Sequence, residues 1–522
     1  MKAIAFINDN IVWGAPMLAL MLFTGVFFTV KTDFFQARYF PKILRNTVFS
    51  KQEKSDEISP FAAMCQALAA TLGTGNIAGV STALSIGGAG AVFWMWISAF
   101  FGMMTGFAEN VLGILYRKKE NGKTLSGAMY YIRDGLAESR KTRFLSRPLS
   151  VIFAALCVVS CFGMGNAAQM NSAAEAVKTG FGIPPIVTGI VLAALAGVIV
   201  FGGAKRISAF TSKLVPLMSG FYIIGCLYIL IANANQLPAV FLGIVRSAFG
   251  LSQIGGGIAG AAVKTAVSMG FKRGVFSNEA GLGTSVFAHA ASGIKDPVVC
   301  GMWSVFEIFF DTIVMCSLTA LVLLTARCGA APAGEVLKNV STKTQYFCLY
   351  ENAGLITEGV KFPEEIKCRS VYGDELYVTP PDALTYTNLF SVKGEFDAQS
   401  GRIVSAKIEP LYGVGLAEHA FSASFGKPAG VMLAVLVVMF AFSTVLGWSC
   451  FGAEAAAFLF GDRIRKPFSA VFIVFAAVGA TVNMSAAWGI SDMMNGLMAV
   501  PNLIAVLCLS KKVFSAVKNY TK

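Results

Sequence analysis

The chain has 522 residues, of which 55% are hydrophobic types and only 14% are charged types. Soluble globular domains usually carry about 25% charged residues, so this composition excludes a water-soluble globule, a disordered chain and a small disulfide scaffold. The formal net charge of +13 would suggest nucleic acid as the partner of a soluble protein, but in a membrane protein it reports on topology, and we expect no nucleic-acid partner.

Eleven apolar runs predict eleven membrane-spanning helices, since a helix needs about 20 residues to cross a bilayer. The runs do not alternate apolar with polar residues, which excludes an outer-membrane β-barrel. The first run, Ile11 to Val30, is followed by no small-residue cleavage site, so we interpret it as a retained span and not a signal peptide. The later runs begin near Phe61, Ala91, Leu149, Ile183, Leu214, Ile254, Val298, Ala429, Phe468 and Met493. The predicted fold class is an all-α polytopic membrane protein.

Lysine and arginine are distributed unevenly between alternate connections. We take the connection from Lys31 to Ser59 as cytoplasmic and leave out the polar insertion described next. On this assumption, 26 Lys and Arg residues lie on the cytoplasmic side of the predicted membrane and three lie on the other side. Because basic residues gather in cytoplasmic loops, we predict that the N-terminus lies outside and the C-terminus in the cytoplasm.

The stretch from Arg327 to Lys427 is polar, mixed in charge and predicted to lie outside the membrane. Its segments Glu375–Val378 and Arg402–Val404 have β-type composition, so we expect a small β-rich extracytoplasmic insertion. A poorly ordered loop is the alternative, because the stretch is also rich in glycine, proline and charge. Cys348 and Cys368 could pair in an oxidising compartment, and the sequence leaves that disulfide open.

The first unusual membrane segment is Ala69–Val80. Gly73 and Gly75 flank Thr74 and precede Asn76, and glycines weaken a helix at mid-membrane. A break here would free N–H groups whose positive dipole end can bind a carboxylate, and carbonyls suited to a small cation. Glycine spacing alone fits close helix packing equally well.

The second unusual segment is Phe271–Thr284, in the seventh apolar run. It holds Lys272, Arg273 and Glu279, and a charge at mid-bilayer costs about 2.5–3.5 kcal/mol on insertion scales. We therefore expect these side chains to face a cavity or one another. An aqueous loop at this point would leave the apolar runs on either side too short to cross.

The two unusual segments lie in the second and seventh predicted spans, five spans apart, so they run in opposite directions. Spans two to six and seven to eleven would then be inverted repeats of five helices, each beginning with a broken helix, as in many secondary transporters. The predicted divisions are an extra span and basic loop (1–59), the first repeat (60–233), the start of the second repeat (254–326), the insertion (327–427) and the end of the second repeat with a cytoplasmic tail (428–522).

Several longer motifs follow one another along the chain: Gly73–Gly79, Phe93–Trp96, Phe107–Glu109, Gly182–Pro185, Phe276–Gly283, Phe442–Trp448 and Pro501–Ile504. Together they resemble the alanine/glycine:cation symporter family over all but the ends and the insertion. The resemblance implies a sodium:alanine or sodium:glycine symporter of a bacterial inner membrane, with one helix added before a ten-helix core like that of the bacterial leucine transporter. It implies sodium as the coupling ion and no other cofactor. Thr284-Ser-Val departs from the family pattern at the inner half of span seven.

The resemblance also implies the substrate-binding residues: Thr74, Gly75, Asn76, Gln169, Phe276, Ser277, Asn278 and Trp448. The amides of Thr74 and Gly75 would bind the substrate carboxylate, and backbone acceptors at Phe276 to Asn278 would bind its ammonium. Gln169 would line the pocket. Trp448 would close the pocket and limit the side chain to about a methyl group.

For sodium, the resemblance implies the hydroxyls of Ser443 and Thr444 together with carbonyls near Ala69 and Leu72. Asn76 offers one more oxygen. Hydroxyls and carbonyls at a helix break suit sodium without a fixed carboxylate. On their own, hydroxyls such as these more often bond back to their own helix.

Four further carboxylates lie in or beside apolar runs: Glu109, Glu307, Asp311 and Glu454. Glu307 and Asp311 are one helical turn apart and should face the bundle interior. Roles in gating or proton relay are open, and we favour structural or gating partners such as Lys264 or Arg273.

A membrane-embedded enzyme is disfavoured, because the two histidines, His289 and His419, lie on opposite sides of the predicted membrane and form no catalytic cluster. The main hypothesis is sodium-coupled uptake of alanine, glycine or a similar small neutral amino acid by alternating access. Proton coupling and a passive channel are the alternatives.

Overall fold

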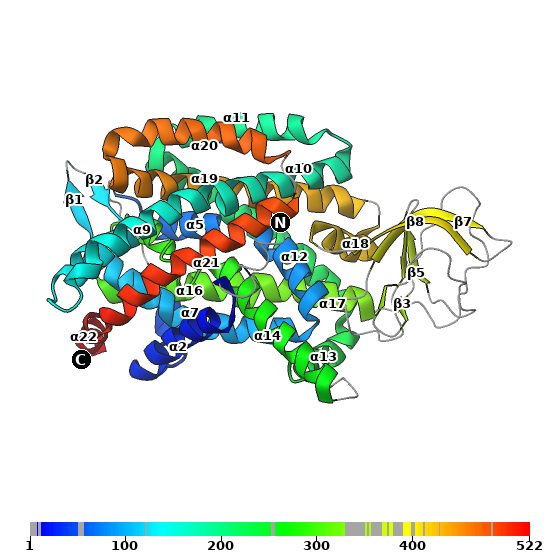
Figure 1. Ribbon diagram of the computed structural model, residues 1–522, viewed down its shortest axis with the longest axis horizontal. Helices are drawn as coiled ribbons and strands as arrows, with labels where there is room; N and C mark the ends of the chain where they lie inside the picture. The colour runs from blue at the N-terminus through cyan, green and yellow to red at the C-terminus, as the bar shows by residue number, and fades with distance from the viewer. Residues whose placement is uncertain are drawn as a thin grey trace.

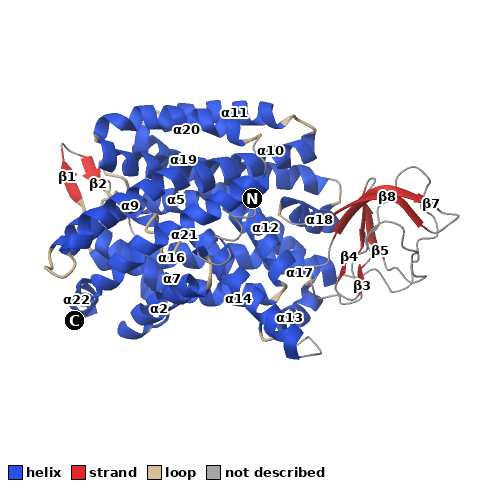
Figure 2. Cartoon of the chain, viewed as in Figure 1, coloured by secondary structure: helices blue, strands red, loops and turns tan. Residues whose placement is uncertain are grey.

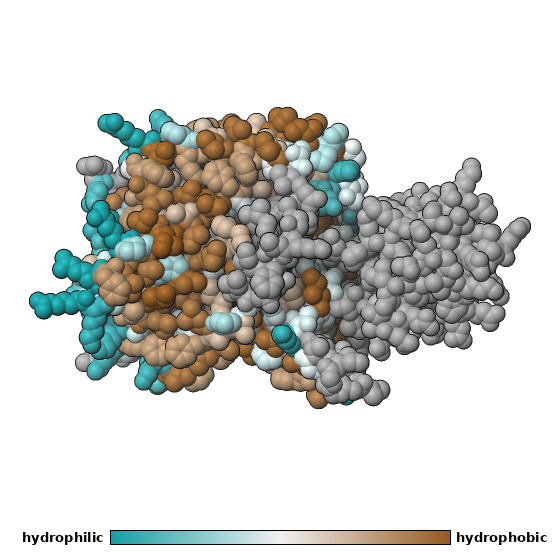
Figure 3. Space-filling view, viewed as in Figure 1, coloured by the Kyte–Doolittle hydropathy of each residue, from teal (hydrophilic) through white to brown (hydrophobic). Residues whose placement is uncertain are grey.

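The computed structural model describes residues 8, 12–50, 57–120, 123–251, 256–328, 413–426, 428–481 and 484–521, together with six strands between 350 and 410. Its helices pack into one bundle (Figures 1 and 2). Hydrophobic residues form a broad band across this bundle (Figure 3). Hydrophilic residues gather at the end of the bundle where the C-terminus lies (Figures 1 and 3). Large apolar side chains such as Ile190 and Ile224 are 55% and 68% exposed, which fits a surface that contacts lipid.

The elements of the first half are α2 (Ala15–Lys31), α3 (Phe35–Arg38), α4 (Phe40–Asn46), α5 (Pro60–Thr71), η2 (Thr74–Asn76), α6 (Ala78–Gly87), α7 (Gly90–Leu115), β1 (Lys118–Glu120), β2 (Lys123–Leu125), α8 (Ala128–Tyr130), η3 (Tyr131–Gly135), α9 (Arg143–Phe162), η4 (Gly163–Ala167), α10 (Ala168–Phe181), α11 (Pro185–Val200), α12 (Gly203–Ala232), η5 (Ala234–Gln236) and α13 (Leu237–Ala248).

The helices of the second half are α14 (Gly256–Asn278), α15 (Ser285–His289), α16 (Pro297–Ile308), η6 (Phe309–Cys316), α17 (Ser317–Cys328), α18 (Val414–Phe425), α19 (Pro428–Phe460), η8 (Asp462–Ile464), α20 (Arg465–Gly479), α21 (Met484–Cys508) and α22 (Ser510–Thr521).

Five helical stretches of the described chain are each long and apolar enough to cross a membrane: Gly90–Leu115, Arg143–Phe181, Gly203–Ala232, Pro297–Thr325 and Pro428–Phe460. Ala15–Lys31 and Pro185–Val200 are apolar but shorter. The prediction of an all-α protein with several membrane spans is therefore confirmed.

The first predicted break is present. α5 ends at Thr71, a single tight turn covers Thr74 to Asn76, and α6 begins at Ala78. The backbone changes direction at Gly73, whose N–H donates to the carbonyl of Thr71 at 2.8 Å instead of continuing the helix. The glycine-rich composition thus produces a break rather than only close packing.

The second break lies in the later half of the predicted segment Phe271–Thr284. α14 continues through Phe276 and Ser277 to Asn278, and α15 begins at Ser285. Between them the backbone has positive φ at Glu279 (+56°), Gly281 (+92°) and Gly283 (+71°). Phe276–Asn278 therefore form the last turn of a helix, where carbonyl groups lack an intrahelical partner.

Helices from the two halves of the chain pack closely. A Cβ on Gly447 of α19 would lie 2.9 Å from both the amide nitrogen and the Cβ of Ala70 on α5. Real Cβ atoms do not approach a backbone nitrogen so closely, so glycine is required for this contact. It brings α19 beside the end of α5, directly before the first break.

The strands of the polar stretch form an antiparallel sheet. Strands β5 (Cys368–Tyr372), β6 (Glu375–Val378), β7 (Phe390–Asp397) and β8 (Arg402–Pro410) are hydrogen-bonded in that order, and β3 (Tyr350–Glu351) pairs with β4 (Gly354–Leu355). Strands are thus present at Glu375 and Arg402, where the sequence predicts them. The proposed pairing of Cys348 with Cys368 lies outside the described side chains.

The sheet and α22 lie at opposite ends of the molecule (Figure 1). We call the end that carries β1, β2 and α22 the basic end. There α22 bends by 58° from the helix before it. Lys512 on α22 contacts Glu138 at 2.8 Å, and hydrogen bonds from Lys512 and Tyr116 lower the pKa of the Glu138 carboxyl. These contacts hold the C-terminal helix against the bundle.

Candidate functional site

The first break is held by a side chain from α10. The Oε1 atom of Gln169 accepts hydrogen bonds from the backbone N–H of Thr74 at 3.0 Å and from its hydroxyl at 2.9 Å. The Gln169 amide nitrogen donates to the carbonyl of Met164 at 3.1 Å, which fixes the orientation of the side chain. Gln169 thus lies beside Thr74 and satisfies the N–H donor that was predicted to bind a substrate carboxylate.

Asn76 connects the first break to the second broken helix. Its Oδ1 accepts from the N–H of Gly73 at 3.1 Å, while its Nδ2 donates to Ser277 Oγ at 3.0 Å and to Asp311 Oδ1 at 2.7 Å. Ser277 lies in the last turn of α14 and Asp311 in η6. All three side chains are buried, so a polar centre joins three separate segments.

Asp311 receives neutral donors on both carboxylate oxygens. Besides Asn76, the hydroxyls of Ser277 and Thr312 donate to its Oδ2 at 2.7 and 2.8 Å. The suggested partners Lys264 and Arg273 are wrong for Asp311, because these bonds come from amide and hydroxyl groups. The sequence shows Asp311 as a buried acid, but only the structure places it between the two broken helices.

The two predicted sodium-binding hydroxyls lie on α19. Ser443 Oγ and Thr444 Oγ1 both donate to the carbonyl of Phe440, at 2.8 and 3.1 Å. This uses their hydrogens and leaves oxygen lone pairs available for a cation. Thr444 lies at the first break, since a Cβ on Gly73 would be 2.6 Å from its Oγ1. Ser443 and Thr444 are fully buried.

Ala69 and Leu72, whose carbonyl oxygens were predicted to bind sodium, lie at the end of α5 that precedes the first break. Ala69 is in the last turn of α5, and Leu72 follows directly at the break. Both are buried. The close approach of α19 to α5 at Ala70, together with the contact between Gly73 and the Thr444 hydroxyl, places this end of α5 beside Thr444.

The last turn of α14 faces the first break. A Cβ on Gly75 would lie 3.4 Å from the ring of Phe276, so the two segments are in contact. Asn278 donates to the Thr312 hydroxyl at 3.1 Å and accepts from the N–H of Ala280 at 3.0 Å. The structure therefore brings Gly75, Phe276, Ser277 and Asn278 to one region of the protein interior.

Trp448 lies one helical turn beyond Thr444 on α19. Its indole Nε1 donates to Glu279 Oε1 at 3.1 Å, and both residues are buried. Gly165 permits this position, because a Cβ there would be 2.3 Å from Trp448 Cβ. α19 thus contributes Thr444 to the first break and Trp448 to the second.

Side chains from other helices satisfy the backbone at the second break. Glu109 on α7 accepts from the N–H of Gly283 at 3.2 Å, and Asn502 on α21 donates to the carbonyl of Gly281 at 2.8 Å. Asn502 also donates to Glu109 and accepts from the hydroxyl of Tyr131. The sequence did not predict these supporting roles, although the motifs Phe107–Glu109 and Pro501–Ile504 contain Glu109 and Asn502.

Two of the remaining buried charges meet an acid that the sequence analysis did not name. Lys272 and Arg273 both approach Asp492, at 3.0 and 3.5 Å, and do not face Glu279 as their partner. Glu307 contacts His289 at 2.8 Å, so the suggested pairing of Glu307 with Lys264 or Arg273 is wrong.

Glu454, the fourth buried or partly buried acid, pairs with Arg465. This pair lies near the start of α20, at the end of α19, and so apart from the two breaks. It joins the end of α19 to the start of α20.

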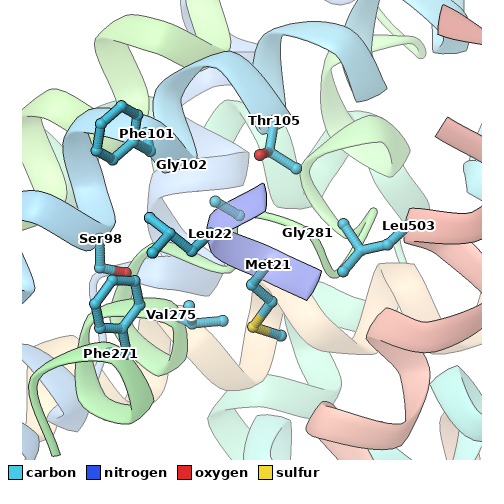
Figure 4. A pocket seen from close by; sticks show the side chains of 11 residues that line it. Met21, Leu22, Ser98, Phe101, Gly102, Thr105, Phe271, Val275, Gly281 and Leu503 are labelled. Atoms are coloured by element: carbon cyan, nitrogen blue, oxygen red, sulfur yellow. The ribbon is translucent and has the colours of Figure 1, made fainter. Parts of the chain in front are cut away.

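A pocket lies beside the second break but outside the predicted site (Figure 4). It is lined by residues of α2, α7, α14 and α21 and by the break itself: Met21, Leu22, Ser98, Phe101, Gly102, Thr105, Phe271, Val275, Ala280, Gly281 and Leu503. No predicted substrate or sodium residue is among them. The pocket lies between α2 and the second broken helix, because Met21 and Leu22 line one part of it and Phe271 and Val275 line another.

Comparisons with known proteins identify the family of this chain. The profile of the sodium:alanine symporter family matches residues 1–348 and 399–522. The sodium/alanine symporter AgcS of Methanococcus maripaludis is 35% identical over 100% of this chain and 98% of its own. The putative sodium/proton-dependent alanine carrier protein YrbD of Bacillus subtilis is 30% identical over 98% of this chain and 91% of its own.

A third relative is the probable sodium/glutamine symporter GlnT of Bacillus subtilis, 29% identical over 100% of this chain and 91% of its own. The family match covers nearly the whole chain, and the relatives are covered over most of their length. The protein is therefore a membrane transporter, not an enzyme, and it belongs to the sodium:alanine symporter family.

Proposed function

We propose that this protein is a secondary transporter that couples the entry of sodium to the uptake of a small neutral amino acid such as alanine or glycine. The observation that carries the proposal is the buried polar centre formed by Asn76, Ser277 and Asp311. It joins two interrupted helices, and interrupted helices facing each other are the usual binding element of such transporters. The family and the names of its relatives support the same class of activity.

The proposed topology has eleven spans with the N-terminus outside. It counts the five long helices, the broken pairs α5/α6 and α14/α15, and α2, α11, α20 and α21. The spans after α2 then form two inverted repeats of five, as in the bacterial leucine transporter. The unmatched stretch 349–398 supports an insertion between the family's helices, which we place outside the plasma membrane of the cell.

The proposed substrate site uses the freed ends of the two broken helices. The N–H groups of Thr74 and Gly75 would bind the carboxylate, and Gln169 would exchange its bond to Thr74 for the incoming carboxylate. The carbonyls of Phe276, Ser277 and Asn278 would bind the ammonium, because the last carbonyls of a helix lack internal partners. Trp448 would form the wall that faces the substrate side chain.

The proposed sodium site combines the carbonyls of Ala69 and Leu72 with the hydroxyls of Ser443 and Thr444. Sodium binds oxygen ligands of this kind. It would tie α19 to the end of α5 across the first break, so that binding the ion orders the segment that also binds substrate. This shared segment gives a physical reason for coupling.

We add Asp311 to the proposed ion-binding residues because of its position. Its carboxylate lies 2.7 Å from the side-chain nitrogen of Asn76 and is surrounded by neutral donors. A buried carboxylate without a basic partner is costly, and a bound cation would offset that cost. A bound proton would do so equally, which makes proton coupling the second candidate function.

Uptake into proteoliposomes tests the proposal. Labelled alanine, glycine and glutamine are supplied with and without an inward sodium gradient, at matched pH and membrane potential. We expect saturable alanine uptake that needs the sodium gradient. Uptake that persists without sodium and collapses with a protonophore would support proton coupling, and uptake that does not saturate would indicate a channel.

A further inference from the structure

The indole of Trp448 is restrained from three directions. Its Nε1 donates to Glu279 Oε1 at 3.1 Å, and its ring lies 5.8 Å from that of Phe451. On the third side is Gly165, where a Cβ would be only 2.3 Å from Trp448 Cβ and 2.4 Å from its Cγ. Packing therefore fixes the base of the side chain, and the hydrogen bond to Glu279 fixes the tip of the indole.

Glu279 itself occupies an unusual backbone position. It follows the last residue of α14 with φ at +56°, and its N–H still donates to the carbonyl of Val275 at 2.8 Å. This left-handed conformation at a helix end normally favours glycine, because a Cβ makes it less stable. A side chain retained at such a position, and only 2% exposed, suggests that its carboxylate has a function.

The position of the indole relates this bond to the substrate site. Trp448 is one turn beyond Thr444, whose hydroxyl lies at Gly73 of the first break. Its partner Glu279 directly follows Asn278 of the second broken helix. The indole thus contacts the second break from a helix that also reaches the first break.

We propose that Glu279 is a positioning residue that sets substrate size by holding the Trp448 indole in place. The inference rests on the proposed function, because it requires a substrate between the breaks. Without an acceptor at position 279, the buried indole N–H loses its partner and the ring is no longer held in one orientation. The indole can then move aside, and the site accommodates substrate side chains larger than a methyl group.

The test compares two replacements of equal length in proteoliposomes. Glu279→Gln keeps a side-chain oxygen that can accept from the indole, whereas Glu279→Met removes it, and both are unbranched like glutamate. The readout is the preference for alanine over valine, taken as the ratio of their uptake efficiencies under one sodium gradient. We expect Glu279→Gln to keep the wild-type ratio and Glu279→Met to lower it about tenfold.

A double-mutant cycle shows whether the effect passes through the indole. In Trp448→Phe, which keeps a ring but lacks the N–H, adding Glu279→Met is expected to change the alanine-to-valine ratio less than twofold, because coupled residues are not additive. Glu279→Ala serves as a second acceptor-free variant if Glu279→Met does not accumulate in the membrane.

The outcomes separate the two proposals. A wild-type protein without sodium-driven alanine uptake would overturn the proposed function. Normal wild-type uptake with an unchanged alanine-to-valine ratio in Glu279→Met would overturn only the role of Glu279. Equal effects of Glu279→Met in the wild-type and Trp448→Phe proteins would also overturn it, since the residue would then act without the indole.

Discussion

The side-chain nitrogen of Asn76 lies 2.7 Å from a carboxylate oxygen of Asp311. Asn76 belongs to the first broken helix, and Asp311 lies 235 positions later on a helix that is not broken at the site. Ser277 of the second broken helix bonds to both residues. These three side chains therefore join both broken helices and the helix that carries Asp311 through one buried hydrogen-bond network.

Asp311→Asn is expected to raise the sodium concentration for half-maximal alanine uptake by tenfold or more. The change removes a buried negative charge, and one hydrogen bond to a charged group is worth about 1.5–3 kcal/mol. Sodium titration of uptake in proteoliposomes measures the effect. Glu307→Gln, one helical turn away on the same side, is the control and should keep the wild-type sodium dependence.

Thr444→Val removes a hydroxyl at the first break while preserving the shape of the side chain. If the oxygen binds sodium, its loss should raise the half-saturating sodium concentration about tenfold, since a contact of about 1.4 kcal/mol corresponds to that factor. Thr325→Val is the matched control, because Thr325 also bonds back to its own helix, at the carbonyl of Leu321. Equal sodium titrations for both variants would remove Thr444 from the ion site.

Gln169→Leu should lower the thermal stability of the substrate-free protein. The buried donors of Thr74 lose their acceptor, and an unsatisfied buried group costs about 1–3 kcal/mol. If a substrate carboxylate takes over this role, alanine with sodium should raise the melting temperature of the variant by more than that of wild type. An alanine-induced shift no larger than in wild type would count against the exchange between Gln169 and substrate.

Asp492→Asn should destabilise the fold strongly. Asp492 is the acid beside both Lys272 and Arg273, and its side chain is 4% exposed. Removing one member of a buried ion cluster typically costs about 3–5 kcal/mol. Asp462→Asn is the control, because Asp462 is 56% exposed and exposed pairs contribute about 0–1 kcal/mol. Thermal unfolding in detergent, followed by loss of monodisperse protein, compares the two variants.

Ser139→Cys and Thr179→Cys should be labelled from opposite sides of the membrane. Both residues are exposed, near the start of α9 and near the end of α10. A membrane-impermeant maleimide applied to intact cells should reach Thr179→Cys, and Ser139→Cys only after permeabilisation. Wild-type labelling and a Cys508→Ser background provide the controls. The reverse pattern would invert the proposed orientation.

The sequence by itself determined the class of protein and located the two segments in which the helices break. Long apolar runs with few charges have a stable place only in lipid. Gly73 and Gly75 weaken the helix wherever the segment lies, because glycine loses more conformational freedom on folding than any other residue. Local composition was sufficient for these features, since each depends on neighbours along the chain and on the solvent.

Tertiary structure alone decided which buried polar groups meet. Asp311 bonds to Asn76 and Ser277, Glu279 accepts from Trp448, and Glu109 and Asn502 hold the second break. The sequence located the second break only to the segment Phe271–Thr284, whereas the structure places its start after Asn278, the last residue of α14. Partners such as these are separated by tens to hundreds of residues. In a low-dielectric interior each group must find a partner, and helix packing determines which one lies within reach.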